Sequence, residues 1–325
     1  MKTPVAGGAV PAVTSIASDD ATTPTLASAR SHAAAATPTP REVDRATVQR
    51  WLPQLDGWLL PGSAMYGVQH TWPQLYRSDG EGRFFAIVDG DELLSFCATR
   101  VVTVHGAGEP FAACLLGSVA TAQKRRGQGL ASAVLQHALA ANAAAAAHTL
   151  LWAEQDGLYT RAGFVPGAAE TCLVVARRPN PPTNGARLLV VGDHAAAHRL
   201  HQQKSMRVDR DLPTMSALLT TPGMTALGLE RAGQLVAYAC CGKGADLQGH
   251  WHEFGGAEDD VAALLQAGMH HLGQTDAIVL QPPWRTGLKK ALGRSVVGEV
   301  AVAGPMQRSV GEALPACWID GLDSV

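Results

Sequence analysis

The sequence predicts an α/β (α+β) protein in which strands and helices share buried cores. Two stretches, 84–104 and 225–241, each contain a pair of β-rich runs joined by a short Asp-Gly or Ala-Gly turn, which is typical of a β-hairpin. A third stretch, 114–139, places a short apolar run before apolar positions that recur every three or four residues, as in a strand followed by an amphipathic helix. With 325 residues and 46% hydrophobic content, we expect two domains with cores of their own.

The composition excludes several classes of function. The 26 Lys and Arg against 28 Asp and Glu leave a net charge of -2, so no overall basic field favours nucleic acid. The 6 cysteines lie mostly in apolar runs without Cys-x-x-Cys spacing, which indicates free thiols in a reducing compartment. No apolar run is long enough to span a membrane. We therefore expect a cytoplasmic protein that binds neither nucleic acid nor a membrane.

The segment 1–40 differs in composition from the rest of the chain. It is rich in Ala, Thr, Pro and Ser and almost without large apolar side chains, so its burial would not offset the lost chain entropy. Lys2 is followed by a mixture of Gly, Pro and Ala rather than by a Leu-rich core, which argues against a signal peptide. We predict that this segment is disordered.

From Arg41 onward, the patterns predict a fixed order of elements. These are a helical region over 43–76, a hairpin over 84–104, a strand over 111–121, a helix from 130 that the alanines 143–147 extend, a strand over 148–153, a short helix containing Tyr159, and a strand over 172–176. Asn180 to Gly185 is typical of a linker. Beyond it, the same order recurs in weaker form as far as Leu280, which predicts a second, degenerate copy.

A basic, Gly-rich turn lies between the strand and the helix of 114–139, with the sequence Lys124-Arg125-Arg126-Gly127-Gln128-Gly129. Glycine has no β-carbon, so Gly127 and Gly129 allow a sharp turn and a close approach of a ligand to backbone N–H groups. The first turn of a helix has N–H groups without intrahelical partners and carries partial positive charge. Three cations beside such a turn predict a phosphate or pyrophosphate site, with a plain loop as the alternative.

The spacing Lys124-x-x-Gly127-x-Gly129 resembles the acyl-CoA-binding motif Gln/Arg-x-x-Gly-x-Gly/Ala of the GCN5-related N-acetyltransferase (GNAT) family, with Lys at the first position. The resemblance implies that backbone amides over 126–130 hold the pyrophosphate of coenzyme A. It also implies that Val119 and Thr121, at the end of the preceding strand, meet the pantetheine arm. The residues assigned to acetyl-CoA are Val119, Ala120, Thr121, Lys124, Arg125, Arg126, Gly127, Gln128, Gly129, Leu130 and Ala131.

The stretch Leu158-Tyr159-Thr160-Arg161-Ala162-Gly163-Phe164 is similar to the aromatic-Tyr-x-x-x-Gly-Phe segment of the same family, with Leu before the Tyr. In that family the Tyr is the usual general acid, so the resemblance implies that Tyr159 protonates the thiolate of coenzyme A as it leaves. A phenol suits this step because a pKa near ~10 keeps it protonated at neutral pH, yet it can give its proton to a basic thiolate. Packing at a helix end is the alternative role of Tyr159.

The sequence offers fewer candidates for the general base. An amine must be neutral to attack a thioester, so the ammonium form has to lose a proton before or during the step, and many family members use a Glu or a water relay for this. The strand over 114–121 has no carboxylate, so the nearest candidates are Glu154 and Asp156, which are otherwise solvated loop residues. By resemblance, a backbone N–H near Val119 or Ala120 stabilises the tetrahedral oxyanion.

The resemblance covers 41–178 and implies the GNAT fold, a mixed, mostly antiparallel twisted sheet flanked by helices, here in tandem. The domains that follow are a disordered segment 1–40, a GNAT domain 41–179 that binds acyl-CoA, a linker 180–186 and a degenerate GNAT-like domain 187–325. At the equivalent helix start in the second copy stand Glu258, Asp259 and Asp260, whose charge repels a pyrophosphate. We therefore do not expect the second copy to bind coenzyme A in the same way.

These patterns and the resemblance predict an N-acetyltransferase that moves an acetyl or short acyl group from acetyl-CoA to an amine within a ternary complex. The alternative is a noncatalytic acyl-CoA sensor or scaffold; the intact Tyr159 argues against it, and the absence of a strand carboxylate argues for it. A small-molecule acceptor is expected over a protein, and a homodimer is one assembly that the sequence allows. His250 and His252 share one face of a predicted strand but have no third ligand nearby, so we expect no metal.

Overall fold

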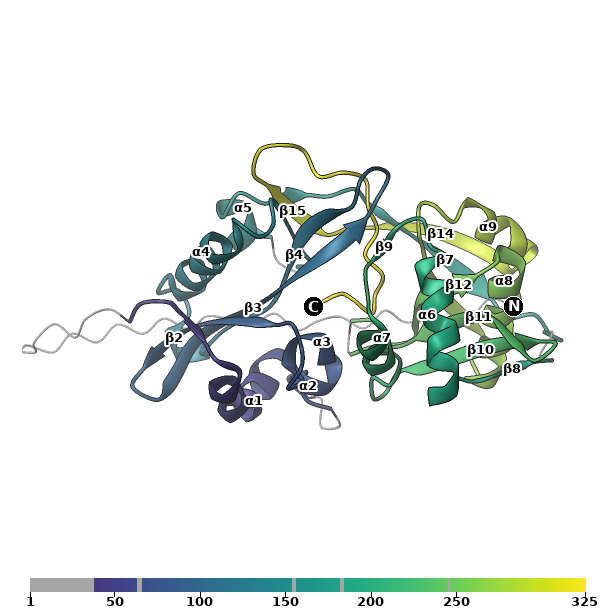
Figure 1. Ribbon diagram of the computed structural model, residues 1–325, viewed down its shortest axis with the longest axis horizontal. Helices are drawn as coiled ribbons and strands as arrows, with labels where there is room; N and C mark the ends of the chain where they lie inside the picture. The colour runs from purple at the N-terminus through teal and green to yellow at the C-terminus, as the bar shows by residue number, and fades with distance from the viewer. Residues whose placement is uncertain (1–37, 63–65, 154–155, 182–183, 245) are drawn as a thin grey trace, which may run out of the picture. The chain divides into compact units, whose positions relative to one another are not determined.

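A computed structural model describes residues 38–325, except 63–65, 154–155, 182–183 and 245. In this part of the chain the strands form two sheets, each flanked by helices (Figure 1). The predicted fold of mixed, mostly antiparallel sheets flanked by helices is therefore confirmed. None of the described helices has the length and apolar character needed to cross a membrane. The predicted disorder of 1–40 falls outside the described residues, apart from 38–40.

The first half of the chain supplies most of the first sheet. Its helices are α1 (Arg45–Leu59), α2 (Val68–Thr71), α3 (Pro73–Tyr76), α4 (Leu130–Asn142) and α5 (Gly157–Arg161), with a short 3-10 helix, η1 (Gln123–Arg125), before α4. Its strands are β1 (Arg41–Val43), β2 (Arg83–Asp89), β3 (Glu92–His105), β4 (Phe111–Thr121), β5 (His148–Leu151), β6 (Val165–Pro166) and β7 (Glu170–Ala176). The predicted first hairpin is thus β2–β3, and the predicted strand over 111–121 is β4.

Both faces of the first sheet are buried because apolar side chains alternate between them along β2. Phe85 and Ile87 pack in the cluster that contains the apolar face of α4. Phe84 and Ala86 belong to the cluster under α1, α2 and α3. Helices therefore cover the sheet on both sides, and α4 lies along one of them (Figure 1).

Helix α4 ends at Asn142, before the alanines 143–147 that were expected to extend it. The Asn142 side chain is buried and donates to Thr99 Oγ1 at 3.2 Å and to the carbonyl of Ala138 at 2.8 Å. These bonds tie the end of the helix to β3, and residues 143–145 form a turn. Alanine propensity is thus overridden by a tertiary contact.

The second half supplies most of the second sheet. Its helices are α6 (His194–Gln202), α7 (Leu212–Leu219), α8 (Glu258–His271) and α9 (Thr286–Leu292), with 3-10 helices η2 (Val191–Asp193) and η3 (Gly293–Ser295). Its strands are β8 (Ala186–Leu188), β9 (Arg207–Val208), β10 (Thr225–Arg231), β11 (Gln234–Cys241), β12 (His250–Gly256), β13 (Asp276–Gln281), β14 (Val296–Val302) and β15 (Met306–Ser309). Along β11, Ala237 and Ala239 pack with α8 and α9, whereas Tyr238 and Cys240 pack with α6 and α7.

The two sheets exchange strands. The first sheet has the order β1-β2-β3-β4-β5-β15-β6, with β9 paired to β3, and the second has the order β14-β7-β13-β12-β11-β10-β8. Strand β7 therefore pairs with β13 and β14, while β15 pairs with β5. The strand predicted over 172–176 is present as β7, but it lies in the second sheet, and pairing between distant segments leaves no local signal in the sequence. The division into 41–179, 180–186 and 187–325 stays a prediction about folding units, and β8 already begins at Ala186.

The end of the chain, residues 318–325, is here called the tail. It contains no helix or strand among its residues, yet 318–323 are buried. Ile319 packs in a cluster with β3, β4 and β5 of the first sheet. Leu322 packs with Tyr238 of the second sheet, and Val325 contacts the first sheet again. The tail therefore joins the apolar clusters of both sheets.

Candidate active site

The candidate site lies where the parallel strands β4 and β5 separate. They pair only over 113–115 and 148–150, although β4 continues to Thr121. Beyond Leu115, the edge of β4 that faces β5 has no strand partner in the described part of the chain. Unpaired N–H and C=O groups of a strand edge are a template for an extended ligand. This geometry suits the pantetheine contacts predicted for Val119 and Thr121, which stay a prediction.

A β-bulge distorts β4 at the same place. Phe96 pairs with Ala120 and Ala98 pairs with Gly117, so β4 has one more residue than β3 between the two pairs. Ser118, inside the bulge, has a positive φ of 54°, which non-Gly residues rarely adopt. Bulges and such conformations are frequent at functional sites. Val119 lies in the bulge and Ala120 borders it, where the oxyanion donor was expected.

The basic turn leads from β4 into α4 with its backbone open. Gly127 and Gly129 have φ of 77° and 79°, and a β-carbon at either would meet no atom within 4 Å. Among the described residues, no hydrogen bond is donated by the backbone N–H groups of 127–132, and the first bond into the helix is from Ala133 to the carbonyl of Gly129. Free amides at a helix N-terminus form an anion site.

The cations of the turn are arranged around these amides. Lys124 and Arg126 are exposed, and Arg126 Nε donates to the carbonyl of Thr121 at 3.3 Å. Arg125 is half-buried and lies 3.6 Å from a carboxylate oxygen of Asp89. The remaining residues expected to contact the coenzyme divide by exposure, with Gly127, Gln128 and Gly129 exposed, Ala131 half-buried and Leu130 buried on the sheet. The structure therefore brings together the turn that the sequence predicted.

Tyr159 lies in α5 and belongs to the same apolar cluster as Val119 of the bulge. Its ring packs edge-on against Phe164, with ring centroids 6.0 Å apart. Burial, with a smaller contribution from Cys97, raises the pKa of Tyr159 to about 12. Cys97 is the residue of β3 opposite the bulge, so the phenol lies near the point where β4 opens. A phenol that stays protonated is suited to the role of general acid.

Two further hydroxyls gather at the bulge, and the sequence did not single them out. Tyr76 Oη and Ser118 Oγ are buried, and neither makes a hydrogen bond of normal length to the described residues. Burial raises the pKa of Tyr76, and hydrogen bonding to the Ser118 side chain lowers it in part, so the two hydroxyls face each other. The bulge therefore brings together two buried hydroxyls that are close enough to interact.

The candidate bases are distributed unevenly. Glu154 lies outside the described residues, and Asp156 is exposed at the start of α5, where its backbone carbonyl accepts from Thr160. Glu170 on β7 was not predicted; burial raises its pKa to about 7, and Trp152 lowers it in part. Trp152 follows β5 and packs in the same cluster as Val325. A carboxyl that titrates near neutral pH is matched to general-base work.

The tail reaches the bulge. A β-carbon on Gly117 would lie 2.3 Å from the backbone carbonyl carbon of Val325 and 2.5 Å from its oxygen. Only a residue without a side chain permits this approach. Gly117 neighbours Ser118, so the tail packs directly against the backbone of the bulge.

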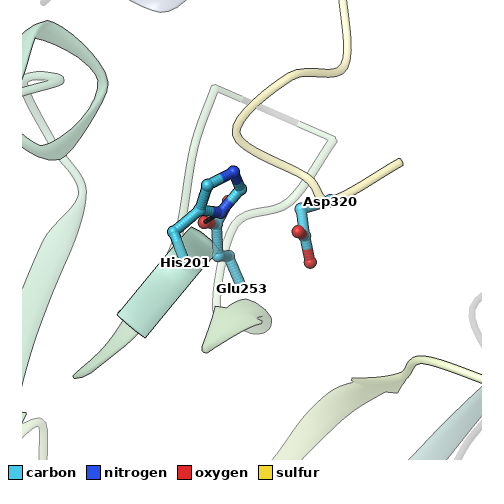
Figure 2. A group of neighbouring side chains, drawn as sticks. All are labelled: His201, Glu253 and Asp320. Atoms are coloured by element: carbon cyan, nitrogen blue, oxygen red, sulfur yellow. Dashed lines mark ion pairs between the residues drawn. The ribbon is translucent and has the colours of Figure 1, made fainter. Parts of the chain in front are cut away.

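Behind the tail lies a buried ion-pair network. Figure 2 shows His201 and Glu253 facing each other, with Asp320 of the tail beside them. His201 Nδ1 lies 3.5 Å from Glu253 Oε1. These three side chains lie close enough to hold a metal ion. Their oxygens are already engaged, however, since Lys204 Nζ lies 3.1 Å from Glu253 and 2.8 Å from Asp320, and Arg210 Nη1 lies 2.6 Å from Glu253. The geometry favours ion pairing over metal binding.

Charges in this network compensate one another. Burial by itself raises the pKa of Glu253, but Arg210 and Lys204 hold it well below its usual range. His252, one of the paired histidines of β12, is buried with neither ring nitrogen bonded among the described residues, and burial lowers its pKa to about 3. Its imidazole is therefore neutral at physiological pH. His252 is thus a buried packing residue.

The sequence did not single out several candidate site residues, for one common reason. Tyr76, Ser118 and Glu170 do not belong to any recognisable sequence motif, and the tail is distant in sequence from the site. One signal was available: Gly117 follows the apolar run 114–116 inside a strand, and a glycine within a strand indicates a bulge or a close approach of another backbone.

Comparisons with known proteins agree with this geometry. Residues 80–166 match the family model described as an acetyltransferase (GNAT) domain. No curated protein matches the sequence. A protein of unknown function from Enterococcus faecalis, described as a probable N-acyltransferase, is 14% identical, with a TM-score of 0.65, and the match covers 84% of this chain and 73% of that one.

Two further solved structures have a similar fold. The GCN5-related N-acetyltransferase from Anabaena variabilis is 14% identical over 84% of this chain and 73% of its own, with a TM-score of 0.61. The Saccharomyces cerevisiae N-myristoyltransferase with bound myristoyl-CoA is 9% identical over 84% of this chain and 83% of its own, with a TM-score of 0.54. These similarities show that the chain has the GNAT fold, and residues 80–166 match the model of an acetyltransferase (GNAT) domain.

Proposed function

We propose that the protein is an N-acetyltransferase that transfers an acetyl or short acyl group from acyl-CoA to an amine in a ternary complex. The observation that carries the proposal is the open backbone of 127–132, whose N–H groups have no partner among the described residues and are flanked by Lys124 and Arg126. These amides bind the pyrophosphate, as free amides at helix N-termini bind anions. The unpaired edge of β4 pairs with the pantetheine arm and directs the thioester toward the bulge.

The reaction has one bond formed and one broken at carbon. The amine nitrogen attacks the thioester carbonyl, a C–N bond forms, and the C–S bond to coenzyme A breaks. Tyr159 gives its proton to the departing sulfur, which suits a phenol whose pKa is raised to about 12. The amine releases one proton, so amide and thiol are formed without net gain or loss of protons. A backbone N–H at Val119 or Ala120 stabilises the oxyanion.

Glu170 is the base that we propose among the described carboxylates. Its pKa, raised by burial to about 7, allows it to hold the proton that the amine gives up. It neighbours Trp152, and Trp152 and Val325 pack against the same apolar cluster. Glu154 and Asp156 remain alternatives from the sequence. The hydroxyls of Tyr76 and Ser118 bind the acceptor, which we propose to be a small amine because the tail packs against the backbone beside Ser118.

Calorimetric titration with acetyl-CoA tests the proposal in the wild-type protein and in Gly129→Glu. The new carboxylate enters the pyrophosphate site, so binding is expected to be lost. Gly233→Glu is the matched control, because Gly233 has φ of 74° and, like Gly129, has no atom within 4 Å of a β-carbon position. It carries the same backbone strain and the same charge in the β10–β11 turn.

One-to-one binding that is lost only in Gly129→Glu supports the site, and a panel of primary amines then tests turnover. Binding without transfer to any amine favours the noncatalytic acyl-CoA sensor. No binding by the wild-type protein, or equal binding by a folded Gly129→Glu variant, contradicts the proposal.

A further inference from the structure

Lys243 is a fully enclosed lysine that no step of the proposed reaction uses. It follows β11 in the second half and is 3% exposed. Its Nζ lies 2.9 Å from the carbonyl oxygen of Gly321, 3.0 Å from that of Leu322 and 2.7 Å from that of Ser324. An ammonium has three N–H donors, and here each has a carbonyl of the tail as its acceptor. Lys243 therefore binds the backbone of the tail.

The same stretch of tail is bound from the first half. Gln74 of α3 donates from Nε2 to the carbonyls of Leu322 and Ser324, both at 3.3 Å. The carboxylate of Asp323 accepts hydrogen bonds from Arg100 Nη1 of β3 at 3.1 Å and from Arg210 Nε at 3.0 Å. The tail has no helix or strand of its own, so these bonds and its apolar contacts fix its path.

The path ends at the candidate active site. Ser324, which Lys243 binds, precedes Val325, whose backbone occupies the space beside Gly117. Gly117 adjoins Ser118, whose hydroxyl faces that of Tyr76 at the bulge. A displacement of the carbonyls that Lys243 holds must therefore move the backbone that packs against the bulge.

We propose that Lys243 is a positioning residue for the site on the first sheet, acting through the carbonyls of Gly321, Leu322 and Ser324 to hold the tail against Gly117. The inference rests on the proposed function, and it assigns a role to the second half of the chain. The second half does not bind coenzyme; it sets the acceptor side of the site in the first half. Binding of acyl-CoA at α4 is independent of this contact.

The test compares Lys243→Met with Leu292→Ala in the whole protein. Methionine keeps the length of the side chain and removes every donor. Leu292 is fully buried in the core under α8 and α9, so its truncation lowers stability without touching the tail. Thermal unfolding measures the folded fraction of each variant, so that the two are compared at the same folded fraction. The readouts are acetyl-CoA affinity, amide hydrogen exchange over 321–325, and kcat and KM for the best acceptor among benzylamine, spermidine and a short peptide with a free N-terminus.

For Lys243→Met we expect faster exchange over 321–325 and a kcat/KM for the amine lower by about tenfold or more, the scale of a misplaced reacting group. Acetyl-CoA affinity is expected to change by less than about twofold in both variants, because the amides of 127–132 are untouched. Slow hydrolysis of acetyl-CoA without amine is expected to rise only in Lys243→Met, as water enters beside the loosened tail.

Equal losses of amine transfer in the two variants overturn the positioning role. Failure of the wild-type protein to bind acetyl-CoA overturns the proposed function and the inference together, so the two failures are told apart by the first titration. If Lys243→Met does not fold, Lys243→Gln, which keeps an amide donor, takes its place in the same comparison.

Discussion

The N-termini of α4 and α8 occupy similar places in the two sheets but differ in how open their backbones are. Each helix follows a strand of its sheet and a glycine turn. At α4, the β-carbon positions of Gly127 and Gly129 face open space and the amides of 127–132 have no partner among the described residues. At α8, a β-carbon on Gly256 would lie 2.4 Å from the carbonyl of Val236, so the turn is closed by the neighbouring strand.

The charges of the two turns also differ. Three cations precede α4, whereas α8 begins with Glu258, Asp259 and Asp260. Arg285 is 3% exposed; it donates to the carbonyl of Gly256 at 2.9 Å and lies 3.2 Å from Glu258. Acidic residues satisfy the positive end of the helix from within the chain. A helix N-terminus thus serves a ligand only where the chain leaves its amides open and its first turn free of carboxylates.

The largest predicted effect is on turnover at the candidate active site beside α4. Tyr159→Phe removes the proton donor and leaves the amides of α4 intact, so turnover is expected to fall by about 10²-fold with acetyl-CoA affinity unchanged. Steady-state transfer to the best amine, together with calorimetry, measures both. Unchanged turnover removes Tyr159 from the role of general acid and leaves it as a packing residue against Phe164.

A second prediction converts one turn into the other. Ala131→Asp with Ser132→Asp gives α4 the acidic first turn of α8, and affinity for acetyl-CoA is expected to fall by about tenfold or more through repulsion of the pyrophosphate. Stability is expected to rise by about 0.3–1 kcal/mol per carboxylate, because each complements the helix dipole. Thermal unfolding and calorimetry therefore move in opposite directions.

The mirror variant is the control for this prediction. Asp259→Ala with Asp260→Ser removes two carboxylates from α8 but leaves Arg285 and the close approach of Val236 in place. We expect the stoichiometry of acetyl-CoA to stay at one, because charge alone does not open the turn. A second molecule bound to this variant would show that the closed backbone is no obstacle.

The sequence was sufficient where the determinants are local. Strand β4 and the start of α4 follow from apolar spacing and glycine placement, and the residues of the basic turn lie together as expected. Helix α7 was missed although Asp211 caps it, accepting from Thr214 N at 2.8 Å, and Pro213 stands in its first turn. That pattern is a recognised helix start and was legible.

What depends on distant segments was not predictable from one sequence. The exchange of β7 and β15 between the sheets depends on which backbones pair, and side-chain periodicity does not predict strand partners. The tail lacks a periodic pattern because its path is fixed by hydrogen bonds from Lys243 and Gln74 to its carbonyls, and not by one apolar face of a helix or strand. Ser118 and Glu170 gain their character from burial, which exists only in the folded chain.

The smallest predicted effect concerns pH and again separates the halves. Burial lowers the pKa of Lys243 to about 7, from 10.5. The charges that face it are Asp323, Glu253, Arg210 and Arg100, with His252 neutral beside them. Above pH 7 the folded protein releases the proton while the unfolded chain keeps it until about 10.5. At this site the unfolded state then binds more protons than the folded state, so the contribution of Lys243 to the free energy of unfolding is expected to rise with pH in this window.

The difference in slope between the wild-type protein and Lys243→Met is expected to approach about 1.4 kcal/mol per pH unit between pH 7.5 and 8.5, because thiols of the unfolded chain, which begin to ionise in this window, contribute equally to both proteins. Denaturant unfolding of the wild-type protein and of Lys243→Met measures it, since the methionine variant must lose the difference in slope. A neutral amine has two N–H donors instead of three, so one tail carbonyl loses its bond as the pH rises. Hydrogen exchange over 321–325 is therefore expected to quicken, beyond its intrinsic dependence on pH, while the contribution of Lys243 to global stability increases. Identical slopes in both proteins would mean that the three carbonyls keep Lys243 charged.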